Sequence, residues 1–283
     1  MNWIVLARDA LKLMRVHNCL IGAFSVVVGT VIAGSSPGVA TRGAVVTFLA
    51  AAGGYILNDL FDVETDRLVK PWRPLALGFD RRVASILLIL FWSSGLLLAI
   101  FDGLILTIFC CLWLGMLTAY TLVIKGMGVF GNLVTSSVSA SGLLLGGFLA
   151  GHPQTTVIPF MLGFLLHMMR EIIKSIADYR GDSKLDVRTV AVRWGIAKCV
   201  WLVIALGIML MVLGILPFAI NQFGIFYLVV VVAGVYPLLV LAMRRLLQPR
   251  ESVEIEKRAM TASMLLKLAM PIGLVAFIAG RLI

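Results

Sequence analysis

The chain has 283 residues, of which 61% are hydrophobic and 13% are charged, and it carries a formal net charge of +10. Soluble domains are about 45–50% apolar and about 25% charged. The composition therefore excludes an ordinary soluble protein with a polar surface and indicates a protein whose solvent is lipid.

Apolar runs long enough to cross a membrane recur along the whole chain. Spanning the hydrocarbon takes roughly 20 consecutive apolar residues. The runs that approach this length are Val16–Gly34, Gly43–Leu60, Val83–Phe101, Gly103–Val123, Val129–Gly151, Thr155–Ala177, Val200–Ile220, Gly224–Met243 and Met264–Leu282. They predict an all-α, polytopic membrane protein, a bundle of about nine transmembrane helices. No long linker divides the chain, so residues 1–283 are expected to form a single membrane domain.

Lysine and arginine residues are concentrated in alternate connections between these runs. They are frequent before the first run and between the second and third, sixth and seventh, and eighth and ninth runs, whereas the intervening connections hold little beyond Arg42 and His152. Because Lys and Arg stay on the cytoplasmic side, the pattern predicts a cell-membrane protein with its N-terminus and acidic segments in the cytoplasm. Topology and attraction to anionic lipid account for the positive charge, so no nucleic-acid partner is expected.

The segment NDLFDVETD follows the second run and puts carboxylates where a helix leaves the membrane. Asn58, Asp62 and Asp66 are four residues apart and would share one face of a helix. Asp59 would lie about 100° from that face, where it would either support the site from behind or face solvent. Because like charges at this spacing repel, something positive must offset them.

The segment ADYRGD after the sixth run repeats this spacing with Asp178 and Asp182. Oxygen ligands at this density suit a hard cation, and Mg²⁺ is commonly held by a few carboxylates together with substrate phosphates. Basic residues are interleaved with the acids of both segments: Arg67, Lys70, Arg73, Arg180 and Lys184. Carboxylates for a metal beside cations for phosphate predict a diphosphate site.

Other acidic residues near these segments are weaker candidates. Glu64, Asp80 and Asp102 are expected to be ordinary loop residues. Asp186 continues the four-residue spacing from Asp182, so it is either a further ligand or a loop acid.

Two other interpretations compete with an enzyme. A single Asp at the end of a span is most often a solvated or capping residue, but two matched sets on one predicted side are hard to explain in that way. Intramembrane carboxylates also mark cation-coupled transporters. Transporters more often carry single carboxylates within broken helices, whereas here the acids lie at span ends and precede basic loops, which favours an enzyme.

The motifs and the helix layout together resemble the UbiA superfamily of intramembrane polyprenyltransferases. That family carries an NxxxDxxxD motif after its second span and a DxxxD motif after its sixth, which here are Asn58–Asp62–Asp66 and Asp178–Asp182. The segments RVHNCLIGAFSVVVGTVIAG, GNLVTSSVSA and REIIKSIADYRGD resemble the branch that attaches a second geranylgeranyl chain to a glycerol phosphate ether lipid. That branch usually has Asn-Arg-Pro where this chain has Val-Lys-Pro, with Lys70 in place of the arginine.

The resemblance implies Mg²⁺-dependent transfer of a polyprenyl group, expected to be geranylgeranyl, from its diphosphate to a lipid acceptor. It implies that the catalytic and Mg²⁺-holding residues are Asn58, Asp62, Asp66, Asp178 and Asp182. It implies that the diphosphate and substrates contact Arg15, Asn18, Arg67, Lys70, Arg73, Tyr120, Lys125, Arg170 and Lys174. The expected partners are a polyprenyl diphosphate donor, a lipid or aromatic acceptor and the lipid bilayer. An aromatic prenyltransferase of the quinone, haem or chlorophyll pathways is the alternative within the family.

Overall fold

The structure is a computed structural model of the chain that describes residues 3–247 and 252–282. Its long helices are α1 (Trp3–Met14), α2 (Val16–Ile32), α3 (Pro37–Phe61), α5 (Arg81–Asp102), α6 (Leu104–Leu122), α7 (Val129–Leu149), α8 (Val157–Ala177), α11 (Ile196–Leu213), α14 (Tyr236–Leu247) and α15 (Ser252–Leu282). Short helices connect or extend them: α4 (Val63–Val69), η1 (Ile124–Gly126), η2 (Pro153–Thr156), α9 (Tyr179–Lys184), α10 (Val190–Trp194), α12 (Leu216–Ala219), α13 (Ile225–Val230) and the π-helical turn η3 (Val231–Val235).

The predicted all-α membrane bundle is confirmed. Within the described part of the chain, eight helices are long and apolar enough to cross a membrane. A ninth span is obtained if the segments Leu6–Met14 and Val16–Ile32, which are bent by 49° to each other, count as one. The ninth predicted run, Met264–Leu282, is only the second part of α15, because the first turns of that helix carry charged residues such as Glu254 and Lys257 and lower its hydropathy.

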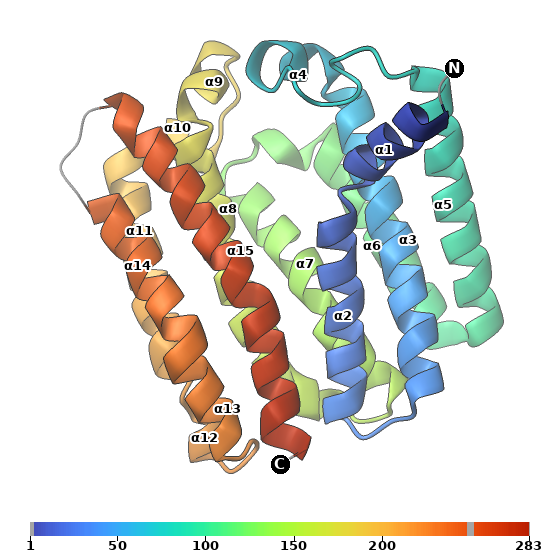
Figure 1. Ribbon diagram of the computed structural model, residues 1–283, viewed down its shortest axis with the longest axis vertical. Helices are drawn as coiled ribbons and strands as arrows, with labels where there is room; N and C mark the ends of the chain where they lie inside the picture. Colours follow the sequence, from blue (N-terminus) through green and yellow to red (C-terminus); the bar gives the residue numbers. More distant parts are fainter. Residues whose placement is uncertain (1–2, 248–251, 283) are drawn as a thin grey trace.

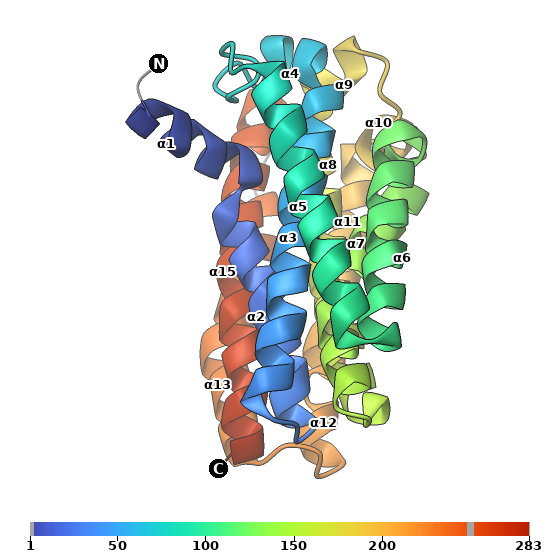
Figure 2. The ribbon, with the colours of Figure 1, turned by 90° about the vertical axis from the view of Figure 1, so that its right-hand side faces the viewer.

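The spanning helices run roughly side by side, and the short helices α4 and α9 lie next to each other at one end of the bundle (Figure 1). The helix α1 also lies at this end, and it projects sideways from the bundle in the view turned by 90° (Figure 2). The helices α2, α7, α8 and α15 contact one another in sequence around the centre, and α3 and α6 contact α7 from the other side. This arrangement surrounds an interior space with helices that are distant in sequence.

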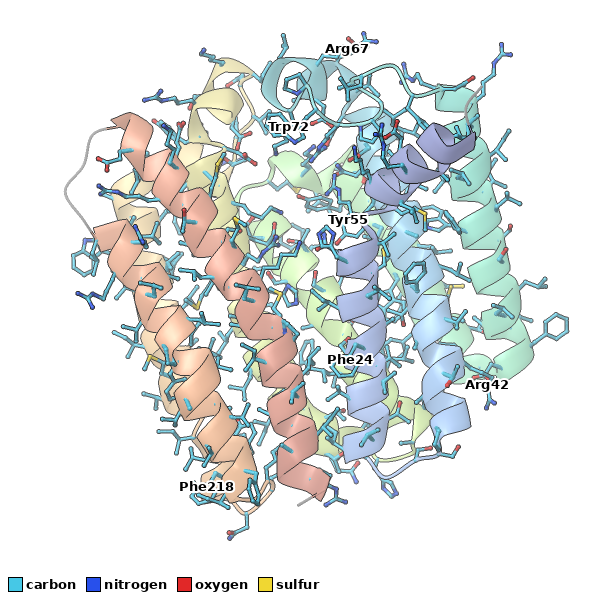
Figure 3. The ribbon with its side chains drawn as sticks, viewed as in Figure 1. Phe24, Arg42, Tyr55, Arg67, Trp72 and Phe218 are labelled. Carbon is cyan, nitrogen blue, oxygen red and sulfur yellow. The ribbon has the colours of Figure 1, made fainter. Side chains whose placement is uncertain are left out.

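The outer surface of the bundle is apolar. Large hydrophobic side chains such as Leu97, Phe101 and Leu104 are exposed on α5 and α6. Arg67 and Trp72 lie at the end of the bundle that carries α4, whereas Arg42 and Phe218 lie at the opposite end (Figure 3). An apolar girdle between two ends that carry polar residues is the surface expected of a protein surrounded by lipid.

Small residues bring α2 and α7 into direct backbone contact. A Cβ added at Gly29 would lie 2.3 Å from the carbonyl oxygen of Leu143, and one added at Gly146 would lie 2.4 Å from the backbone nitrogen of Thr30. Such close crossings depend on residues without side chains, as in other membrane helix pairs. The crossing fixes the position of two helices that line the interior space.

We expect Gly146→Val to destabilise the protein, because the new side chain would overlap the backbone of α2. Overpacking of this kind costs about 1–3 kcal/mol. The thermal unfolding midpoint in detergent should therefore fall. The matched control is Gly115→Val on α6, where an added Cβ would meet nothing within 4 Å. Equal midpoints for the two variants would contradict this packing.

Candidate active site

Both acidic motifs lie at breaks between a spanning helix and a short helix. Asp62 ends α3 and precedes α4 with φ −89° and ψ 3°, and Asp178 ends α8 and precedes α9 with φ −95° and ψ 4°. The i to i−4 backbone hydrogen bonding continues through each break: the backbone nitrogen of Asp66 donates to the carbonyl of Asp62 at 2.7 Å, and that of Asp182 to the carbonyl of Asp178 at 2.9 Å. The predicted four-residue spacing is therefore kept, although each motif is carried by two helices rather than one.

An ion pair joins the first motif's segment to the second motif. Lys70, which follows α4, donates from Nζ to Oδ2 of Asp178 at 2.9 Å. Lys125, in the short helix η1, pairs in the same way with Asp62. Side chains of both motifs line one cavity of about 630 Å³. Residues separated by more than a hundred positions in the sequence thus face the same space.

A buried layer supports the first motif. Asp59 is only 2% exposed, and its Oδ1 accepts from Arg15 at 2.5 Å and from Arg73 at 3.1 Å. Arg73 also pairs with Asp66 at 2.5 Å. Of the two positions expected for Asp59, the structure therefore has the one behind the site and not the one in solvent.

The Arg15 guanidinium contacts an aromatic ring as well as Asp59. Arg15 has a left-handed backbone conformation (φ 50°) at the bend between α1 and α2. Its guanidinium carbon lies 4.8 Å from the centre of the Tyr55 ring, a cation–π contact, while the same side chain reaches Asp59.

Two carboxyl groups of the motifs have perturbed acidity. Burial raises the pKa of Asp66 above its ordinary value, and the Arg73 guanidinium offsets part of that rise. Burial, followed by the charge of Asp178, raises the pKa of Asp182 to about 6. Asp182 forms no ion pair with any residue that the structure describes. Within the described part of the chain, the pair Asp178 and Asp182 therefore shares one ion-pairing cation, Lys70, which contacts Asp178.

The donor set fits a hard divalent cation that is shared with a substrate. Within residues 3–247 and 252–282, no group of three His, Cys, Asp or Glu side chains could hold a metal ion without other ligands. The motifs instead supply pairs of carboxylates on neighbouring elements of one cavity. Mg²⁺ is often bound in this way, by one or two carboxylates together with phosphates and water.

The structure brings almost all of the predicted site residues to the cavity. Those that line it are Arg15, Asn18, Asn58, Asp62, Asp66, Lys70, Arg73, Tyr120, Lys125, Arg170, Lys174, Asp178 and Asp182. Arg67 does not line it: the side chain is 54% exposed and pairs with Glu64 at 3.1 Å on the outer side of α4. Successive residues of a helix are about 100° apart, so while Asp66 faces the cavity its neighbour Arg67 points outward.

The weaker acidic candidates lie away from the cavity lining. Asp186 is exposed, with φ 51°, in the loop after α9, so it is placed as a loop acid. The carboxylate of Asp80 accepts a hydrogen bond from the backbone of Arg82 at 2.7 Å and caps α5. Asp102 pairs with Arg42, which lies at the opposite end of the bundle (Figure 3).

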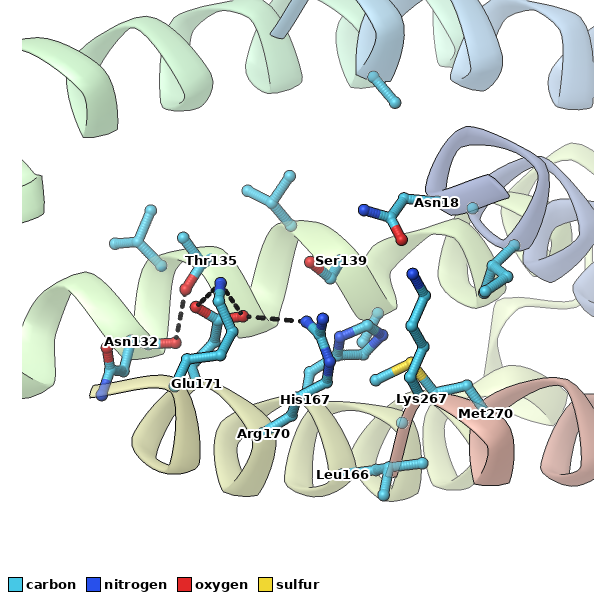
Figure 4. Close-up of a pocket in the computed structure, with 18 of the residues that line it drawn as sticks. Asn18, Asn132, Thr135, Ser139, Leu166, His167, Arg170, Glu171, Lys267 and Met270 are labelled. Carbon is cyan, nitrogen blue, oxygen red and sulfur yellow. Dashed lines mark hydrogen bonds and ion pairs between the residues drawn. The ribbon is translucent and has the colours of Figure 1, made fainter. Parts of the chain in front are cut away.

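Three ionisable residues deeper in the cavity were not among the predicted site residues: His167 and Glu171 on α8, and Lys267 on α15 (Figure 4). Glu171 accepts from Lys174 at 2.9 and 3.0 Å and from Arg170 at 3.5 Å. A signal for these residues was present, because ionisable residues inside an apolar span are usually functional. They were not assigned to the site because they match no motif spacing.

The part of the cavity farthest from the motifs is apolar. Its lining there comes from α11, α13, η3 and α15 and includes Leu210, Tyr227, Val231 and Phe277. The Tyr227 and Phe277 rings stack with centroids 5.6 Å apart, and the Tyr227 hydroxyl donates to the carbonyl of Gly214 at 2.8 Å. The cavity thus runs from a charged end to an end suited to a hydrocarbon chain.

Comparisons with known proteins match this architecture. The model of the UbiA prenyltransferase family matches residues 21–266. Among curated proteins, digeranylgeranylglyceryl phosphate synthase of Saccharolobus solfataricus is 31% identical over 97% of both chains, and that of Metallosphaera sedula is 34% identical over 96% of this chain and 95% of its own.

Solved structures agree with the sequence matches. A structure of digeranylgeranylglyceryl phosphate synthase superposes with a TM-score of 0.75 at 28% identity and covers 98% of both chains. A UbiA homologue from Archaeoglobus fulgidus, solved bound to GPP and Mg²⁺, has a TM-score of 0.69 at 15% identity and covers 94% of this chain and 99% of its own.

We expect Arg73→Met to destabilise the protein, because Asp59 and Asp66 would lose a buried cation. Removing one partner of a buried ion pair costs about 3–5 kcal/mol, and the remaining Arg15 contact puts the expected loss near the lower figure. The measurement is the thermal unfolding midpoint in detergent. Arg67→Met is the control, because exposed pairs contribute about 0–1 kcal/mol. Adding Asp66→Asn to Arg73→Met should recover part of the loss; no recovery would contradict this pairing.

Proposed function

Because the chain belongs to the UbiA prenyltransferase family, we propose that it transfers a geranylgeranyl group from its diphosphate to geranylgeranylglyceryl phosphate, a step in ether-lipid synthesis. One observation carries the proposal: a single cavity combines two pairs of carboxylates, several cations and a long apolar end. Such a space suits a substrate with a diphosphate head and a hydrocarbon tail. The names of the Saccharolobus and Metallosphaera relatives support the choice of acceptor.

We assign the charged end to the donor diphosphate. Asp62, Asp66, Asp178 and Asp182, with Asn58, are the proposed ligands of Mg²⁺, and the Mg²⁺ bound to the Archaeoglobus homologue supports this choice. Bound there, the metal would neutralise charge on the departing diphosphate. Lys70 and Lys125 would also neutralise charge on the diphosphate. Each is paired with a carboxylate of one motif, so its ammonium group could transfer from that carboxylate to a diphosphate oxygen.

The reaction breaks the bond between C1 of the prenyl group and its diphosphate oxygen, and the bonding electrons leave with the diphosphate. The oxygen of an acceptor hydroxyl forms the new bond to C1, and the hydroxyl proton passes to the departing diphosphate. An allylic cation reacts readily with water, so the apolar walls of the cavity serve to exclude water during transfer. The apolar end near Tyr227 and Phe277 is the proposed place of the prenyl chain.

We also propose that the end of the bundle bearing α4 and α9 faces the cytoplasm. The basic residues of the connections at that end, such as Arg81, Lys184 and Arg188, support this orientation. The N-terminal helix α1 lies at the same end (Figure 1). In this proposal residues 1–283 act as one membrane domain.

The proposed function predicts that Asp62→Asn and Asp178→Asn each abolish turnover, because either change removes a charge that would hold the metal. Purified protein is supplied with geranylgeranyl diphosphate, Mg²⁺ and geranylgeranylglyceryl phosphate, and diphosphate release is measured. Asp186→Asn is the matched control, since Asp186 lies outside the cavity lining. Near-full activity of either motif variant would contradict the metal assignment. Transfer to an aromatic acceptor alone would contradict the proposed acceptor.

Removal of divalent ions is a second test. We expect a chelator such as EDTA to stop turnover and excess Mg²⁺ to restore it, because carboxylates without a cation would repel the diphosphate. The same assay of diphosphate release measures both steps. Rates that stay unchanged in the chelator would rule out a metal-dependent mechanism.

A further inference from the structure

The cavity contains a group of basic side chains, here called the basic cluster, that lies deeper in the membrane than the acidic motifs. It consists of His167 and Arg170 on α8 and Lys267 on α15. These three side chains converge on one part of the cavity, which Asn18 of α2 faces from the other side (Figure 4). Arg170 precedes Asp178 by eight residues on α8, which corresponds to about 12 Å along the helix. The basic cluster is therefore separate from the end where the two motifs meet.

This cluster has too few anionic partners among the residues around it. Glu171 is the acidic side chain at this level, and it already accepts from Lys174 at 2.9 Å and from Arg170 at 3.5 Å. Lys267 forms no ion pair with any described residue, and the charges that act on it are those of Arg170 and Arg15, both positive. The Arg170 Nε is buried and has no hydrogen-bond partner among the described residues.

A cation without an anionic partner inside a membrane domain, as Lys267 is among the described residues, is costly and is usually kept for a function. A cluster of this kind is suited to an anion with several oxygens. A phosphate monoester carries about 1.5 to 2 negative charges and three acceptor oxygens. Arginine provides a fork of donors, lysine a point charge, and the Asn18 amide a further donor.

We propose that Arg170, Lys267 and His167 form the subsite for the phosphate monoester of the lipid acceptor, separate from the subsite for the donor diphosphate. This inference rests on the proposed function, since it requires an acceptor that carries a phosphate. The acceptor hydroxyl lies only a few bonds from its phosphate. A phosphate held at this level therefore sets the hydroxyl between the basic cluster and the diphosphate end, where C1 of the donor would lie.

The test is a comparison of two acceptors, geranylgeranylglyceryl phosphate and its dephosphorylated alcohol, in the unmodified protein and in Lys267→Met. The measured quantity is the ratio of kcat/KM for the phosphate to kcat/KM for the alcohol. Loss of one charged hydrogen bond should lower this ratio by about 10- to 100-fold. The KM for the acceptor phosphate should rise, while the KM for the donor diphosphate should stay within about twofold of that of the unmodified protein.

Two further variants separate this role from a structural one. Lys267→Arg keeps the charge and should restore most of the preference for the phosphate. Lys257→Met makes the same change on the same helix at an exposed position outside the cavity lining, and it should leave the ratio unchanged. Neither result follows if Lys267 only supports the packing of α15.

The outcomes distinguish this inference from the proposed function. If the unmodified protein makes no product with geranylgeranylglyceryl phosphate, the proposed function is wrong and the subsite is wrong with it. If the unmodified protein prefers the phosphate but Lys267→Met keeps the same ratio, the subsite alone is wrong. A ratio that collapses in Lys267→Met and recovers in Lys267→Arg supports the subsite.

Discussion

The site depends on cations placed between carboxylates that would otherwise repel one another, and the ion pair between Lys70 and Asp178 links the two acidic motifs in this way. The motifs follow different spanning helices, and this pair joins the residue after α4 to the residue before α9. Carboxylates that converge on one cavity would repel each other if no cation lay between them. Lys70, Lys125 and Arg73 supply those cations, each paired with a motif carboxylate. The same basic residues that stabilise the closely spaced acids are therefore available to bind a phosphorylated substrate.

Charge is ordered along the length of the cavity. At the end near α4 and α9, the carboxylates of the two motifs meet in the cavity, and Asp182 has no ion-pair partner among the described residues. Two to three helical turns deeper, Lys267 likewise lacks an anionic partner, so this level has excess positive charge. Beyond it the lining becomes apolar at Tyr227 and Phe277. The carboxylates at the first level suit a divalent cation, the basic side chains at the second suit a phosphate, and the apolar lining at the third suits a hydrocarbon chain.

Much of this could be predicted from the sequence because it depends on local patterns. Run length indicated the spanning helices, and the spacing of Asp62 with Asp66 and of Asp178 with Asp182 marked the residues that line the cavity. What could not be predicted depended on tertiary structure. Arg67 turns outward because α4 packs with Asp66 toward the cavity, and the choice between the two positions left open for Asp59 depends on Arg15 and Arg73, which reach it from distant segments. His167 and Lys267 meet only when α8 and α15 pack together, and no spacing in the sequence records that contact.

The glycine contact between α2 and α7 limits where the bundle can open to admit a lipid. Because Gly29 and Gly146 let the two backbones touch, a shift of either helix by one residue would drive Leu143 or Thr30 into a space with no room for a side chain. Contact between the two backbones therefore opposes sliding of one helix along the other. We expect the bundle to open for a long-chain substrate at helix contacts made through side chains, and not at this one.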